Sequence, residues 1–274
     1  MAESAPSTQG HYLKKDNTVA MKRILLFIRK ELQIEKSYRF NMAIKAVALF
    51  FQMAVFYYIG TVVSFGGYFS FVLIGLIFSR FFGFWLGVFC ETLRHEQYWG
   101  TAEQLFLSPT HPLAIMIMLA VPKLMWLVIE IGFLIALGII AFGATLQVSA
   151  SALLAIIGVN SIFFAGLGLL SAAFVLYFKR GDPINWLVTS SVELASGVYF
   201  PLTVLPQPLY AVAAALPTTQ ALNMWRAASL EQTPLSWHAV AVQLMWGAVC
   251  IAAGSWAFMK AYQAARKKGT LGHY

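Results

Sequence analysis

Residues 196–226 read SGVYFPLTVLPQPLYAVAAALPTTQALNMWR, a stretch that begins like a membrane span and is then interrupted by prolines. Four of the chain's ten prolines lie in it: Pro201, Pro206, Pro208 and Pro217. Proline lacks a backbone N–H and breaks a helix, yet the stretch is too apolar for an ordinary loop in water. Backbone groups left unpaired inside a membrane survive only where protein or water surrounds them. The pattern therefore predicts a short helical re-entry, in which the chain turns at Pro206 and Pro208, forms an apolar helix through LYAVAAAL and turns again at Pro217.

The composition indicates an integral membrane protein. Of the 274 residues, 59% are hydrophobic and 11% are charged, whereas a soluble domain has about 45–50% apolar and about 25% charged residues. The net charge of +8 does not indicate nucleic-acid binding, because most cations flank the apolar stretches, as membrane topology requires. The two cysteines, Cys90 and Cys250, lie in apolar runs and predict neither a disulfide framework nor a metal site.

Six stretches are long and apolar enough to cross a bilayer, which takes about 20 residues. We expect an all-α protein with one six-span domain over residues 41–264. The predicted spans are 41–63, 68–90, 113–143, 148–178, 184–204 and 237–259.

The distribution of basic residues predicts the orientation of the chain. With both termini in the cytoplasm, the inside segments carry 15 of the 19 Lys and Arg residues, and the outside segments carry only Arg226. This bias follows the positive-inside rule. Residues 1–18 are then a disordered N-terminal tail and residues 265–274 a basic C-terminal tail, both cytoplasmic.

Residues 19–40 precede the first span and are different in character. Apolar residues recur in them at helical spacing, and the basic residues mostly fall elsewhere on the helical wheel. This pattern predicts an amphipathic helix that lies in the membrane interface, with its cations near anionic lipid headgroups. The alternative is a solvated, charged helix before the first span.

The largest inside loop, residues 91–109, is predicted to contain a second short helix at about 100–109. Gly100 should interrupt the helix that leaves the second span, Thr101 and Gln104 form a capping-box pair, and Pro109 should end the new helix. Leu107 is an apolar residue expected on the surface. Such a helix suits docking into a groove of another protein, although a plain connector remains the alternative.

Ionisable residues within the predicted spans mark the candidate substrate path. Arg80 lies in the middle of the second span and Glu193 in the middle of the fifth. Charges in hydrocarbon are costly unless they face a cavity, a partner or the interface. We therefore expect both to line a translocation pathway together with Tyr199 and Phe200. The alternative is a structural ion pair, or an arginine that binds freed backbone carbonyls.

Across essentially its whole length the chain resembles the permease subunit of a type-2 ABC exporter. The first group of residues that carries the resemblance is Arg29–Leu32 with Ser37–Arg39. The second is Glu91, Arg94, Gly100-Thr101, Glu103, Leu105 and Ser108-Pro109. The third is Ser196-Gly197, Phe200-Pro201, Leu205-Pro206, Leu216-Pro217 and Arg226.

The resemblance implies that the short helix of the inside loop is a coupling helix that meets a cytoplasmic ATPase. The residues it assigns to this contact are Glu91, Arg94, His95, Gly100, Thr101, Glu103, Leu107, Ser108 and Pro109. It also implies a broken pair of external helices at about 201–228 that dips partway into the outer leaflet. The residues it assigns to this external re-entrant gate are Gly197, Pro201, Pro206, Pro208, Pro217 and Arg226. It also implies a second copy of this chain, or a similar permease, with two ATPase subunits.

The chain has no G-x-x-x-x-G-K-[ST] motif, so the expected ATP and Mg would be bound by the separate ATPase and not by this chain. We expect no catalytic residues and no cofactor here, and a location in the cell (inner or plasma) membrane. The expected cargo is an amphipathic molecule, whether lipid-like, lipid-linked, saccharide-bearing or a drug. The alternatives are a polytopic membrane enzyme, and a secondary transporter or channel that does not depend on ATP.

Overall fold

The computed structural model describes residues 39–63, 66–146, 150–178, 183–231 and 236–269. The predicted tail 1–18 and nearly all of the predicted interface helix 19–40 lie outside these ranges. Residues 39 and 40, the end of that predicted helix, belong instead to the first long helix described, α2.

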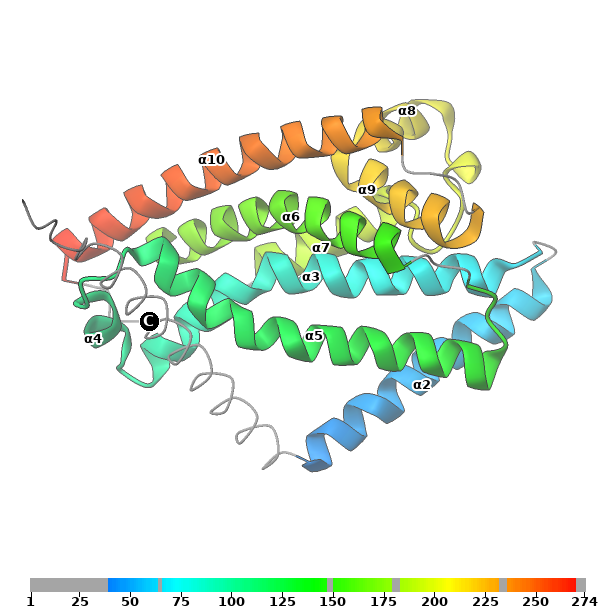
Figure 1. The fold of residues 1–274 in the computed structure, drawn as a ribbon, viewed down its shortest axis with the longest axis horizontal. Helices are drawn as coiled ribbons and strands as arrows, with labels where there is room; N and C mark the ends of the chain where they lie inside the picture. Colours follow the sequence, from blue (N-terminus) through cyan, green and yellow to red (C-terminus); the bar gives the residue numbers. More distant parts are fainter. Residues whose placement is uncertain (1–38, 64–65, 147–149, 179–182, 232–235, 270–274) are drawn as a thin grey trace, which may run out of the picture.

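Within the described residues the fold is helical and contains no strand. Long helices run side by side along the molecule and α2 slants away from the others, while α4 lies at one end and α8 and α9 lie at the other (Figure 1). The elements are α2 Arg39–Val62, α3 Tyr68–Tyr98, α4 Ala102–Phe106, α5 Pro112–Phe142, α6 Ala150–Phe178, α7 Pro183–Ala195, η1 Leu202–Val204, α8 Gln207–Ala215, α9 Pro217–Arg226, η2 Ala227–Glu231 and α10 Trp237–Lys267.

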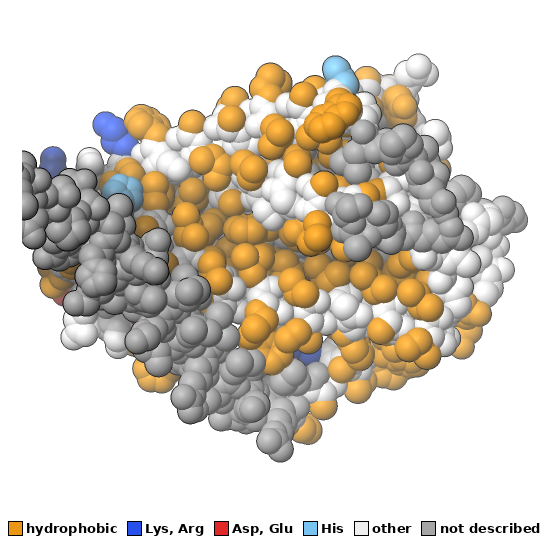
Figure 2. Space-filling view, viewed as in Figure 1, with side chains coloured by type: hydrophobic (Ala, Val, Ile, Leu, Met, Phe, Trp, Pro, Cys, Tyr) orange, Lys and Arg blue, Asp and Glu red, His pale blue; other side chains and the backbone are white. Residues whose placement is uncertain are grey.

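Five of the described helices are long and apolar enough to cross a membrane, namely α2, α3, α5, α6 and α10. Hydrophobic side chains cover much of the visible surface along these helices (Figure 2). The structure thus indicates a membrane protein. Helix α10 continues to Lys267, three residues past the predicted end of the domain at residue 264.

The fifth predicted span, 184–204, is not one continuous helix. Helix α7 has 13 residues and ends at Ala195. The N–H of Val198 bonds to the carbonyl of Glu193, and the N–H of Gly197 bonds to the carbonyl of Leu194. With Gly197 at φ +70°, this is a Schellman helix end. The apolar run predicted a longer helix because apolarity does not distinguish a buried turn from a span.

Helix α3 is the centre of the bundle. In its most apolar stretch 67% of the residues are buried, whereas the corresponding share in the other four long helices is 11–39%. Aromatic side chains fill the contact between α3 and α6, and Phe81 of this cluster also lies 5.5 Å from the Trp225 ring of α9. The fully buried members of the cluster are Phe78, Phe81, Phe82 and Phe164.

Glycines let α6 approach both neighbours closely. A Cβ atom on Gly168 would overlap the backbone carbonyl of Trp85 in α3, and one on Gly166 would overlap the backbone at Cys250 in α10. Small residues serve the same purpose in other membrane helix pairs. The Gly83/Gly87 G-x-x-x-G pattern of α3 is not used in this way: neither glycine approaches another helix within the described residues.

The loop after α3 agrees with the sequence prediction in part. Gly100 at φ +69° ends α3, again in a Schellman arrangement with Thr101 N–H bonded to the carbonyl of Glu96. The capping box was wrong, because the Thr101 hydroxyl donates to the Glu96 carboxylate and does not cap α4. Helix α4 ends at Phe106, before Pro109.

Two short helices, α8 and α9, occupy the region predicted to hold a broken helical pair. Pro206 precedes α8 and Pro217 begins α9. The expected turn at Pro208 is wrong, because Pro208 lies in the first turn of α8, where the missing N–H costs no hydrogen bond. Both short helices lie at the end of the bundle opposite α4 (Figure 1).

Candidate functional site

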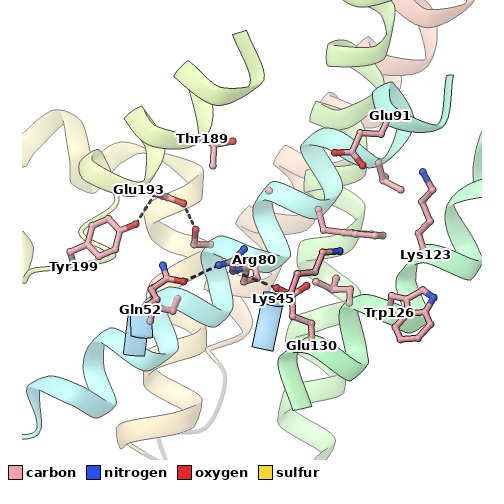
Figure 3. A pocket seen from close by; sticks show the side chains of 16 residues that line it. Lys45, Gln52, Arg80, Glu91, Lys123, Trp126, Glu130, Thr189, Glu193 and Tyr199 are labelled. Carbon is pink, nitrogen blue, oxygen red and sulfur yellow. Dashed lines mark hydrogen bonds and ion pairs between the residues drawn. The ribbon is translucent and has the colours of Figure 1, made fainter. Parts of the chain in front are cut away.

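A cavity of about 650 Å³ lies among α2, α3, α5, α7 and the turn that follows α7. It has six charged side chains in its wall. The lining residues are Lys45, Gln52, Leu76, Ser79, Arg80, Gly83, Phe84, Val88, Glu91, Lys123, Trp126, Leu127, Glu130, Thr189, Glu193 and Tyr199 (Figure 3).

Arg80 joins three helices across the cavity. Its Nε lies 3.6 Å from Oε1 of Glu130 in α5, and its guanidinium donates to Oε1 of Gln52 in α2 at 2.9 Å. Its ion-pair partner is thus Glu130 and not Glu193. About 40% of each side chain of the ion pair is exposed, which is consistent with a position in the cavity wall.

Glu193 is held by two hydroxyl donors. Ser79 of α3 donates to its Oε1, and the Tyr199 hydroxyl donates to its Oε2 at 2.9 Å. The Tyr199 ring stacks on Phe56 of α2, with ring centroids 5.4 Å apart. These contacts fix the carboxylate between α7, α3 and the turn after α7. The predicted pathway residues Arg80, Glu193 and Tyr199 therefore share one cavity.

The polar side chains are spread along the cavity. In Figure 3, Glu193 and Tyr199 lie on one side, and Glu91 and Lys123 lie on the other. Arg80, Lys45 and Glu130 lie between them. A ligand in the cavity would therefore meet charges of both signs. Among the described residues, no three His, Cys, Asp or Glu side chains are grouped as a metal site would require.

Arg226, which the resemblance placed in an external gate, is buried beneath the turn after α7. Its guanidinium donates to the carbonyls of Gly197 and Val198 at 2.7 and 3.3 Å and lies 3.6 Å from the ring centroid of Phe71. Burial lowers the pKa of Arg226 to about 10, so the side chain remains charged at neutral pH. Arg226 is therefore an internal support for the turn that carries Tyr199.

A second contact joins the same turn to α9. The hydroxyls of Ser196 and Thr218 are 2.9 Å apart and both are buried. Among the other residues assigned to the gate, Pro201 is half-buried and Pro206 and Pro208 are exposed. Phe200, assigned to the pathway, is half-buried and does not line the cavity.

The residues assigned to ATPase coupling fall into two groups. Glu91 lies two turns before the end of α3 and lines the cavity. The others lie at the α4 end: Glu103 and Leu107 are exposed, and Leu107 is 79% accessible. Phe106 holds α4 to α10 through the Tyr262 ring, 5.3 Å away. The remaining residues of this group are Arg94, His95, Gly100, Thr101, Ser108 and Pro109.

Gln52 and Ser79, the polar residues that bind Arg80 and Glu193, were not among the predicted site residues. Lys45 and Gln52 are seven residues apart, as are Lys123 and Glu130, so each pair lies on one face of its helix. This spacing was the available signal that α2 and α5 turn polar faces toward the same space. Small polar residues such as Ser79 are too common in membrane helices to be identified in this way.

No protein-family model matches the chain, and no curated protein matches it either. The function must therefore be inferred from the geometry.

Proposed function

We propose that this chain is the transmembrane permease subunit of an ATP-driven type-2 ABC exporter. The observation that carries the proposal is the cavity of about 650 Å³ with six charged side chains in its wall. Charged residues inside a membrane bundle are expensive and are kept where they line a substrate path or serve one another. Arg80 and Glu130 serve one another in part, but a cavity of this size leaves room for a ligand.

The source of energy would be a separate ATPase, since this chain has no P-loop sequence. Helix α4 is the proposed contact. Its Ala102 and Phe106 are buried against the bundle, which leaves Glu103 and Gln104 exposed, followed by Leu107. A helix anchored on one side and exposed on the other can transmit movement of a partner to α3 and α10.

The complete transporter would contain two permease chains, identical or similar, and two ATPases. It would lie in the cell membrane with the α4 end and both termini in the cytoplasm and with α8 and α9 as an external re-entrant gate. Its cargo would be an amphipathic molecule that leaves the cytoplasm or the inner leaflet. The resemblance and the bias of basic residues support this arrangement.

Co-purification with an ATPase tests the proposal. The chain is expressed with each candidate Walker-A ATPase of its own genome, the complex is isolated through a tag on this chain, and ATP hydrolysis is measured in liposomes. We expect a stable complex whose hydrolysis rate differs from that of the ATPase alone. If no ATPase binds and hydrolysis is unaffected, the exporter proposal is wrong, and a secondary transporter or channel is the next candidate.

Leu107→Gln is expected to weaken ATPase binding about tenfold, because a buried apolar anchor at an interface contributes about 1–2 kcal/mol. Leu107 is an exposed apolar side chain directly after α4. Leu209→Gln is the matched control, since Leu209 is 57% exposed in α8 at the opposite end of the bundle. Affinity of the purified complex, measured by surface binding, should fall only for Leu107→Gln. Equal losses in both variants would contradict docking at α4.

A further inference from the structure

Three of the six charges in the cavity, Lys45, Glu91 and Glu193, form no ion pair within the described part of the chain. Arg80 and Glu130 form an ion pair, and Glu91 and Lys123 have opposite charges and lie on the same side of the cavity. Within the described part of the chain, Glu193 receives hydrogen bonds from neutral hydroxyls alone and forms no ion pair. Lys45 forms no ion pair with any described residue either. Because Glu91 lies on the same side of the cavity as the positive charge of Lys123, Glu193 and Lys45 are the negative and the positive group left for a ligand.

We propose that the cavity binds a zwitterionic head group, with its ammonium at Glu193 and its acidic group at Lys45. This inference rests on the proposed function and specifies the chemical class of the cargo. A ligand with one charge of each sign neutralises both groups, whereas a ligand with a single charge leaves one of them without a counterion.

The surroundings of Glu193 suit an ammonium group. A carboxylate has about four lone-pair positions, and the Ser79 and Tyr199 hydroxyls occupy two of them. The remaining positions can accept from a ligand. The ring of Tyr199 also lines the cavity on the same side as Glu193 (Figure 3), and aromatic faces attract ammonium cations. The positive charge of Arg80 is offset by Glu130 and therefore opposes such a ligand little.

The surroundings of Lys45 suit an acidic group that is attached to apolar chains. Lys45 lies two helical turns, about 10 Å, before Gln52 on α2. This part of α2 slants away from the other long helices, and its first buried described side chain is Leu49 (Figure 1). Ile44 and Val47 beside Lys45 are 51% and 54% exposed. A phosphate could therefore bind Lys45 while its acyl chains contact apolar side chains of α2.

Equilibrium dialysis with the purified full chain in a maltoside detergent, without any ATPase, tests this site. The probes are dihexanoylphosphoethanolamine, which is zwitterionic, and dihexanoylphosphoglycerol, which has the phosphate but no ammonium. We expect the first to bind at least tenfold more tightly. Glu193→Gln should abolish this preference, and Lys45→Met should weaken both probes about tenfold. Glu96→Gln, a matched carboxylate loss outside the cavity wall, should change neither result.

Free phosphoethanolamine distinguishes the source of the zwitterion. If it binds as tightly as the dihexanoyl lipid, the cargo is a water-soluble zwitterion; if the chains are needed, the cargo is a lipid. Both results support the site. Equal binding of the two dihexanoyl probes to the wild-type chain would overturn it. So would a preference that survives Glu193→Gln in a chain of unchanged helicity.

Glu193→Asp is the control for a loss of binding that is caused by misfolding. It keeps the charge and should therefore retain part of the preference for the ammonium group. The ATPase test of the proposed function is independent of this experiment. A chain that stimulates an ATPase but shows no preference for the zwitterion leaves the exporter standing and removes the cargo class. A chain that prefers the zwitterion but binds no ATPase keeps the binding site and rules out the exporter.

Discussion

Arg226→Met is expected to lower the free energy of unfolding by about 2–3 kcal/mol. Methionine keeps an apolar stem of similar length but donates nothing, so the carbonyls of Gly197 and Val198 lose their buried donor. A buried polar group left unsatisfied costs about 1–3 kcal/mol, and the cation–π contact with Phe71 is lost as well. The guanidinium no longer has to be buried, which offsets part of this loss.

Chemical unfolding in detergent, followed by circular dichroism, measures the effect. Arg266→Met is the matched control, since Arg266 is exposed in the last turn of α10, where a substitution is expected to change stability by less than about 0.5 kcal/mol. Arg226→Lys should be intermediate, because lysine retains the charge but not the fork of donors. Wild-type stability of Arg226→Met would show that the turn after α7 does not depend on this side chain.

The same substitution connects stability to the cavity. Arg226 binds the backbone of the turn that presents Tyr199, and Tyr199 donates to Glu193. A looser turn would therefore release one of the two donors that position the carboxylate. Binding of the zwitterionic probe should weaken in Arg226→Met even where the protein is still folded.

Much of the fold could be predicted because long apolar runs specify long helices in a membrane. The ranges 41–63 and 113–143 closely match α2 and α5. The end of α7 could not be predicted from hydropathy, since the residues after Ala195 remain apolar although they form a turn. The local signal in the sequence was Gly197. In the structure its left-handed backbone, together with the hydrogen bonds to the carbonyls of Glu193 and Leu194, distinguishes this turn from a continuing helix.

The candidate site could be predicted only through its charges. Arg80 and Glu193 are conspicuous in apolar spans, and both line the cavity. Their partners depend on which helix faces meet, and hydropathy carries no such information. Glu130 therefore became the partner of Arg80 through the packing of α5 against α3, and the sequence alone offered no means of choosing it over Glu193.

Gly168→Val is expected to destabilise the fold by about 3 kcal/mol, near the upper end of overpacking costs. At Gly168 a Cβ atom would overlap the carbonyl oxygen of Trp85 and lie 3.0 Å from Cδ2 of Phe89. A backbone carbonyl cannot change rotamer to make room, so α6 must move away from α3. That movement would also displace Ser79 and Arg80, which α3 presents to the cavity.

Gly158→Val is the matched control in the same helix. No atom lies within 4 Å of a Cβ atom built on Gly158, so this substitution carries the same change in helix propensity without the clash. The difference in unfolding free energy between the two variants, measured in one detergent, isolates the packing of α6 on α3.

A difference below about 0.5 kcal/mol would mean that the two helices can separate at little cost. The cavity could not then depend on a rigid α3, and the zwitterion should bind both variants equally. If α3 is instead held by this contact, Gly168→Val should lose the preference for the zwitterion and Gly158→Val should keep it.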